Sequence, residues 1–172
     1  MRFFWIILLM FFLNVSSYSQ WRSYYPERTS SQKEQEKGNT EKRTQIFETH
    51  LFNALKSKSL ENYDEALKHF EKCIKLNEKT PLPFYESAII NTENGSYATA
   101  IEQIKKAIKL DPKNRWYLLL YAEILFNKQD FVNSATQYKK LIAIEPGNEE
   151  LYFKLSDSYI YANDFKRAIE VY

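Results

Sequence analysis

The chain has 172 residues, of which 44% are hydrophobic and 16% aromatic, so most of it can bury a core. Its 24 basic and 22 acidic residues leave a net charge of +2, which argues against a general nucleic-acid binder with concentrated basic charge. With 3 glycines, 5 prolines and one cysteine, Cys73, the composition excludes collagen-like chains and an internal disulfide framework. We therefore expect a mostly helical protein that is not an enzyme and has no cofactor or metal site.

Residues 1–19 have the layout of a secretory signal peptide. Arg2 supplies a positive charge, residues 3–13 are an uninterrupted apolar run, and Ser17 and Ser19 form a small-residue cleavage site before Gln20. The competing interpretation is an uncleaved membrane anchor. As a helix the apolar run rises only about 16 Å, roughly half of a hydrocarbon core. We therefore expect cleavage, no permanent membrane span afterwards, and a periplasmic or secreted location.

Residues 20–45 are dominated by polar and charged side chains and show no apolar periodicity. Such a composition buries too little apolar surface to offset the loss of chain entropy on folding. This segment is therefore predicted to be a disordered polar linker that precedes a folded region, residues 46–172.

The folded region repeats itself every 34 residues. Four columns of similar residues stay in register over four periods, which chance does not produce. The columns are small residues at Ala66, Ala100, Ser134 and Ala168; aromatic residues at Tyr63, Tyr97, Phe131 and Phe165; large apolar residues at Phe70, Ile104, Tyr138 and Tyr172; and small residues at Ala54, Ala88, Ala122 and Ser156.

Each period contains two helical patterns, because apolar residues recur at spacings of three and four. The second helix of each period is predicted to start after an N-cap residue, and Glu65 suggests a capping box in the first period. The four N-cap residues are Asn62, Ser96, Asp130 and Asp164. Gly95 suits a tight turn before its second helix, whereas Glu61, Gln129 and Asn163 stand at the equivalent positions. Pro112 and Pro146 follow the predicted ends of second helices.

This pattern resembles the tetratricopeptide repeat, whose period is 34 residues. The resemblance covers residues 47–172, with repeats at about 47–80, 81–114, 115–148 and 149–172, the last one incomplete. It implies an all-α, right-handed superhelix of helix-turn-helix repeats, in which the two small columns face each other and the large apolar column packs between neighbouring hairpins. Because Tyr172 falls within the fourth second helix, we expect a fragment of a longer chain, with an apolar edge that could self-associate.

The resemblance also implies a concave groove lined by the first helix of each repeat. The candidate residues are Phe52, Leu55, Tyr85, Glu86, Ile89, Trp116, Leu119, Leu120, Glu123, Phe126, Phe153, Lys154, Asp157 and Tyr161. Several of them are equally compatible with core positions between first helices. One subclass of the family grips C-terminal carboxylates with Lys, Asn and Arg at such positions. Here those positions hold Leu51, Leu55, Glu86, Trp116 and Leu120, so that clamp is not expected.

Residues able to perform catalysis are few. His50 is predicted to be a partly buried packing residue, His69 a surface residue, and Cys73 a buried, inert thiol. A hydrolase using acidic groove residues remains the least favoured hypothesis.

The leading hypothesis is a non-catalytic scaffold that binds a peptide or helix of a protein partner in the groove. Glu86, Glu123 and Asp157 favour a partner with some basic character. The alternative is an N-terminal sensor or assembly module of a larger envelope protein, such as a signalling receptor.

Overall fold

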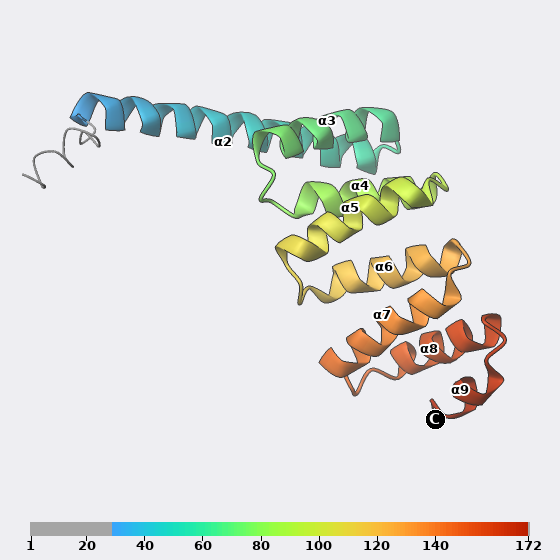
Figure 1. Ribbon diagram of the computed structural model, residues 1–172. Coiled ribbons are helices and arrows are strands. Elements are labelled where there is room, and N and C mark those ends of the chain that lie inside the picture. Colours follow the sequence, from blue (N-terminus) through green and yellow to red (C-terminus); the bar gives the residue numbers. More distant parts are fainter. Residues whose placement is uncertain (1–28, 172) are drawn as a thin grey trace, which may run out of the picture. The chain divides into compact units, whose positions relative to one another are not determined.

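A computed structural model describes residues 29–171 of the chain. The predicted signal peptide and the first part of the predicted linker lie outside the described residues, as does Tyr172. The chain divides into two compact units, Met1–Thr44 and Gln45–Tyr172. Every regular element of the described part is helical (Figure 1), with bounds α2 (Ser30–Ser59), α3 (Tyr63–Leu76), α4 (Leu82–Glu93), α5 (Tyr97–Leu110), α6 (Arg115–Asn127), α7 (Phe131–Ile144), α8 (Glu149–Tyr161) and α9 (Phe165–Ile169).

The predicted disordered linker requires a correction from Ser30 onward, because residues 30–45 belong to the 30-residue helix α2. Lys, Glu and Gln, which dominate this stretch, are good helix formers, and no proline interrupts it. The second half of α2 is the first helix of repeat one, so the unfavourable nucleation step is already provided there. Ala54 is the one described residue of α2 that is buried. None of the helices in residues 29–171 is both long and apolar enough to cross a membrane.

The two small columns face each other within each hairpin, as predicted. Ser134 Oγ donates a hydrogen bond to the Ala122 carbonyl oxygen at 2.8 Å, and Ser156 Oγ donates to the Ala168 carbonyl oxygen at 3.3 Å. A side chain can reach the opposite backbone only if the two helices approach closely. In the two earlier hairpins, alanines take these positions and are fully buried: Ala54 with Ala66, and Ala88 with Ala100.

The large apolar column packs between successive hairpins, which is also as predicted. Phe70 of α3 lies in one cluster with Ile90 of α4. Ile104 of α5 clusters with Ile124 of α6, and Tyr138 of α7 clusters with Leu155 of α8. The second helices α3, α5 and α7 therefore bury their apolar faces against the first helix of the next repeat. The hairpins of residues 45–171 accordingly form a stack in which neighbours stabilise one another.

The turns between first and second helices share one backbone conformation. Gly95 has a φ of 71°, and Glu61, Gln129 and Asn163 have φ values of 57°, 66° and 57°. The chain therefore keeps the left-handed conformation even where glycine is replaced. The predicted N-cap residues do flank the second helices, but only Asp164 caps through its side chain, accepting from the Arg167 amide at 3.0 Å.

Candidate functional site

The first helices of successive repeats contact one another side by side through predicted groove residues. Lys58 Nζ of α2 lies 2.6 Å from Glu86 Oε2 of α4, and Lys154 Nζ of α8 lies 3.7 Å from Glu123 Oε1 of α6. The Phe126 ring of α6 meets the Tyr161 ring of α8 at a centroid distance of 5.3 Å. Neighbouring first helices thus adjoin one another through these side chains. We call the outward side chains of α4, α6, α8 and residues 45–59 of α2 the first-helix face.

Large apolar side chains remain exposed on the first-helix face. The most exposed are Phe52 at 67%, Tyr161 at 60%, Phe153 at 56% and Trp116 at 55%, with Leu55 at 38%. Trp116 lies under the Arg115 guanidinium, 4.6 Å from the ring centroid, and Arg115 Nε is 3.0 Å from Glu145 Oε1. These contacts hold Arg115 against one side of the indole. More than half of the Trp116 side chain nevertheless stays accessible.

Other predicted groove residues are only half exposed, and some of them also pack against the core. Tyr85 is half-buried, and its ring packs against the buried Tyr117 ring at 4.9 Å. Ile89, Leu119, Leu120 and Phe126 are half-buried as well. Burial and the nearby carboxylates of Glu86 and Glu123 raise the pKa of the Tyr85 hydroxyl. Tyr85 therefore supports the stack as much as it presents a surface.

Glu86 does not offer the accessible carboxylate that the sequence suggested. Its side chain is only 14% exposed and is held by Lys58 at 2.6 Å. This ion pair joins the first helices of repeats one and two. The acidic character of the first-helix face consequently depends on Glu123 and Asp157.

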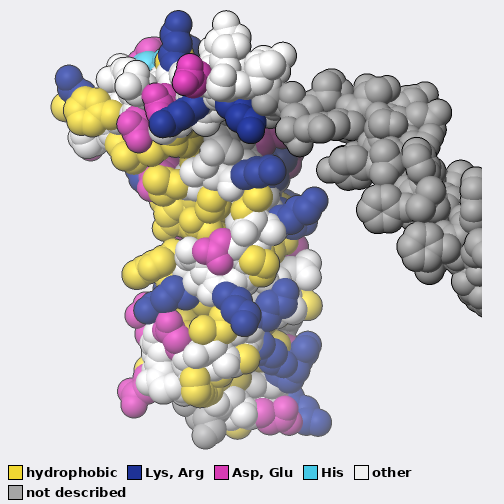
Figure 2. Space-filling model, turned by 90° about the vertical axis from the view of Figure 1, so that its left-hand side faces the viewer, with side chains coloured by type: hydrophobic (Ala, Val, Ile, Leu, Met, Phe, Trp, Pro, Cys, Tyr) yellow, Lys and Arg dark blue, Asp and Glu magenta, His cyan; other side chains and the backbone are white. Residues whose placement is uncertain are grey.

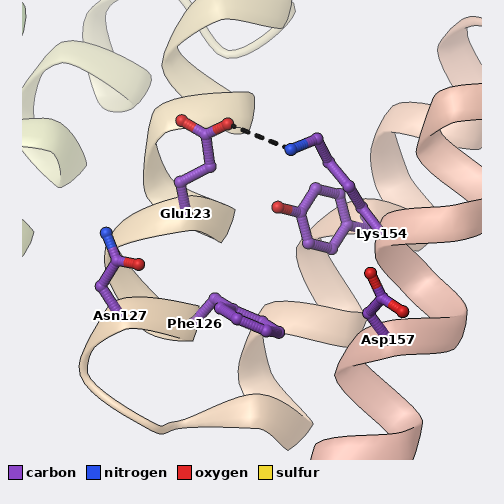
Figure 3. A pocket seen from close by; sticks show the side chains of 6 residues that line it. Glu123, Phe126, Asn127, Lys154 and Asp157 are labelled. Atoms are coloured by element: carbon purple, nitrogen blue, oxygen red, sulfur yellow. Dashed lines mark ion pairs between the residues drawn. The ribbon is translucent and has the colours of Figure 1, made fainter.

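A cavity of about 250 Å³ opens between α6 and α8. Figure 3 shows Glu123, Phe126 and Asn127 on one side and Lys154 and Asp157 on the other, with the Phe126 ring and the Asp157 carboxylate directed toward the space between the helices. The sixth lining residue is Tyr138 of α7, which is buried. Asn127 and Tyr138 were not predicted as groove residues.

Carboxylates outnumber cations around this cavity. Lys154 Nζ lies 3.7 Å from Glu123 Oε1 and also 3.7 Å from Glu150 Oε1, so one ammonium faces two carboxylates, with Asp157 on the next turn of α8. The pKa of the Tyr138 hydroxyl is strongly raised because the group is buried and because Glu123, Glu150 and Asp157 all act on it. Burial is the larger cause of this rise in pKa, and the three carboxylates add to it.

Aromatic rings border the cavity at the ends of α6 and α8. Tyr161 stacks on Phe131 at a centroid distance of 5.3 Å, and Phe126 meets Phe131 edge-on at 5.2 Å. Phe126 belongs to this aromatic cluster and also lines the cavity.

On the side of the loops that join one repeat to the next, hydrophobic side chains are seen among charged side chains of both signs (Figure 2).

His69 is not the simple surface residue that the sequence suggested. Its Nδ1 lies 2.9 Å from Nδ1 of His50 across the α2–α3 hairpin, and its Nε2 lies 3.4 Å from Glu65 Oε1. One ring must donate and the other accept, so the contact needs at least one neutral imidazole. Partial burial, then Lys72 and His69, lower the pKa of His50.

Cys73 is fully buried, as predicted, and burial raises the pKa of its thiol to about 11. Among residues 29–171, no group of three or more His, Cys, Asp and Glu side chains is arranged to hold a metal ion.

Comparisons with known proteins agree with this architecture. Sequence models described as tetratricopeptide repeat match residues 57–80 and 85–149. The chain belongs to the tetratricopeptide repeat family. A comparison with curated protein sequences gives no significant match.

Solved structures of tetratricopeptide repeat proteins share the fold. MamA from Desulfovibrio magneticus RS-1 is similar with a TM-score of 0.68 at 17% identity, covering 73% of this chain and 71% of that chain. The second repeat domain of human RPAP3, in complex with an HSP70 peptide, gives 0.62 at 15% identity, covering 67% and 97%. The TPR2B domain of yeast Sti1, in complex with pHsp70, gives 0.59 at 16% identity, covering 66% and 98%. These likenesses establish a helical superhelix of tetratricopeptide repeats.

Proposed function

We propose that the protein is a non-catalytic scaffold whose first-helix face binds a peptide or helix of a protein partner. The observation that carries this proposal is the set of exposed large side chains Phe52, Trp116, Phe153 and Tyr161, together with an open cavity between α6 and α8. Exposed apolar patches of this kind, rimmed by charged residues, are typical of interaction surfaces. Trp and Tyr are also enriched among residues that dominate binding energy, because they combine a large apolar area with a polar tip.

Similar repeat domains support a peptide as the ligand class, since the RPAP3 and Sti1 domains were solved with HSP70 peptide or pHsp70. The recognition chemistry proposed here is different. Leu51, Leu55, Glu86, Trp116 and Leu120 stand where a carboxylate-binding subclass has cationic or amide side chains. The first-helix face therefore selects its partner through aromatic contacts and not through a terminal carboxylate.

The proposed place of action is the periplasm or the outside of the cell. Its support is the sequence of residues 1–19, where Arg2 precedes an 11-residue apolar run and a small-residue cleavage site. Fusion of residues 1–19 to a reporter that is active only after export tests this part of the proposal. Loss of export on replacing Leu8 and Leu9 with Arg is the expected result, and reporter activity without residues 1–19 would contradict it.

The binding proposal is tested with Trp116→Ala/Phe153→Ala in the full chain. Both side chains are largely exposed, so thermal unfolding should change little. Val132→Ala/Ile144→Ala is the matched control, because these side chains are similarly exposed but lie on the second helix α7. A partner isolated from the exported fraction should bind the first variant at least about tenfold more weakly and the control unchanged. Equal affinity of both variants would contradict the assignment of the face.

A further inference from the structure

We infer that the cavity between α6 and α8 accepts one arginine or lysine side chain of the bound partner, with Glu123 and Asp157 pairing the cation and Phe126 contacting its aliphatic or planar part. This inference rests on the proposed function, since it names a specificity pocket within the first-helix face. It gives the partner a defined chemistry: a basic residue flanked by apolar residues that contact Trp116 and Phe153.

The cavity has the size and lining for such a side chain. Its volume of about 250 Å³ exceeds that of a single side chain, and it opens to solvent between the two helices. The Glu123 carboxylate comes from α6 and the Asp157 carboxylate from α8, so the cavity carries an acidic side chain on each of its two walls (Figure 3). The Phe126 ring is directed into the space between the two helices (Figure 3), and aromatic faces attract guanidinium and ammonium groups. Asn127 adds an amide oxygen that can accept a hydrogen bond from a guanidinium.

The Lys154 ammonium is a cation that lines this cavity and pairs with nearby carboxylates. Its ammonium is 3.7 Å from Glu123 and 3.7 Å from Glu150, longer than a tight ion pair at either end. Because Glu150 is one helical turn before it, Lys154 can stay paired with Glu150 while Glu123 turns to an incoming cation. The intramolecular lysine therefore competes with the ligand, and its removal should improve binding.

The surrounding charges favour a cation and disfavour an anion. Glu123, Glu150 and Asp157 outnumber Lys154 within the cavity and its rim. Burial raises the pKa of the Tyr138 hydroxyl, and these three carboxylates raise it further. Charge complementarity thus selects a basic side chain over a carboxylate, and the interaction should weaken as salt is added.

The test uses a phage-displayed library of random dodecapeptides selected on the full chain. Peptides that depend on Trp116 should share an arginine or lysine at a fixed distance from an apolar residue. A selected peptide is then compared with its neutral analogue, in which citrulline replaces arginine or norleucine replaces lysine. Glu123→Gln should weaken binding of the basic peptide about tenfold and leave the neutral analogue unchanged, while Lys154→Gln should tighten the basic peptide about threefold.

Glu102→Gln is the matched control, because Glu102 also pairs with a lysine, Lys106 at 3.2 Å, but lies on the second helix α5. It should leave both affinities unchanged. Trp116-dependent peptides without an enriched basic residue, or equal weakening of both peptides by Glu123→Gln, would overturn the pocket while the proposed function stands. Failure to select any Trp116-dependent peptide would overturn the proposed function and the pocket together.

Discussion

Gln129 adopts a φ of 66° in the turn that joins α6 to α7, and its replacement by glycine is predicted to stabilise the protein. The turn has the hydrogen bonds of a helix C-terminus: the Asp130 amide donates to the Leu125 carbonyl oxygen at 2.8 Å, and the Gln129 amide donates to that of Phe126 at 2.8 Å. The Gln129 side chain is exposed, so its removal costs no packing. The backbone conformation alone decides the effect.

The magnitude follows from two opposing terms. The left-handed conformation destabilises a residue that has a Cβ by about 1–2 kcal/mol, and glycine avoids this cost. Glycine also increases the entropy of the unfolded chain, which opposes folding by about 0.4–1 kcal/mol. Gln129→Gly should therefore raise the free energy of unfolding by about 0.5–1 kcal/mol. The reverse change at the equivalent turn, Gly95→Ala, should lower it by about the same amount, because a Cβ at Gly95 meets nothing within 4 Å and the φ of +71° is the whole penalty.

The assay is urea denaturation followed by circular dichroism, with thermal unfolding as a second measurement. The slope of free energy against urea should stay constant, so that a shift of the midpoint reports stability directly. Lys128→Gly is the matched control, because Lys128 is also exposed but has a φ of −73°. It should destabilise by about 0.5–1 kcal/mol. If Gln129→Gly destabilised the protein as Lys128→Gly does, the left-handed turn would be refuted.

Three further predictions concern the interior. Phe70→Ala should cost about 3–5 kcal/mol, because Phe70 is fully buried between two repeats, whereas the exposed Phe52→Ala should stay within about 0.5 kcal/mol in the same denaturation assay. The pKa of His50 is lowered mainly by burial, so the folded chain binds fewer protons than the unfolded chain just below pH 6.5. The contribution of His50 to the free energy of unfolding should be fully present above about that pH and be lost as pH decreases through the folded pKa. His50→Gln should reduce this dependence in denaturation curves measured across that range, and an unchanged dependence would exclude His50 as its source. A thiol reagent should label Cys73 at least about 100-fold more slowly in the folded chain than in urea, because burial raises its pKa from 9.0 to about 11; equal rates would show that the thiol is not enclosed.

The repeat columns made the stack predictable because each one records a packing requirement. A small residue is required wherever two backbones approach, as at Ser134, and a large apolar one wherever two hairpins meet, as at Phe70. These requirements recur at fixed spacing, so they are visible without coordinates. The left-handed conformation of Gln129 was not predicted, because glutamine by itself does not indicate it and only Gly95 at the equivalent position does.

Features that depend on contacts between unlike positions were not predictable. The contact of His69 with His50 joins two helices at positions that no column marks. Glu86 was expected to face a ligand, but Lys58 from the neighbouring repeat neutralises it. The helix over residues 30–45 was missed because apolar periodicity is not needed where good helix formers extend a helix that tertiary packing has already started.

The sequence predicted which positions belong to the candidate groove, but it did not predict how exposed each side chain is. Trp116 and Tyr85 were both predicted to line the groove, yet Trp116 is largely exposed while Tyr85 packs against Tyr117. The two residues occupy different positions of the 34-residue period, and within residues 29–171 only Tyr85 of the two has a ring partner on the next first helix. Likewise, Asn127 and Tyr138 line the cavity only because α6, α7 and α8 meet there.

The most direct measurement of the central claim is photocrosslinking in cells that produce the protein natively. A photoreactive phenylalanine analogue is placed at Trp116 on the first-helix face or at Val132, which is equally exposed on the second helix α7. The account predicts a crosslink to one discrete partner from position 116 and none from position 132. A crosslink from position 132 alone would contradict it.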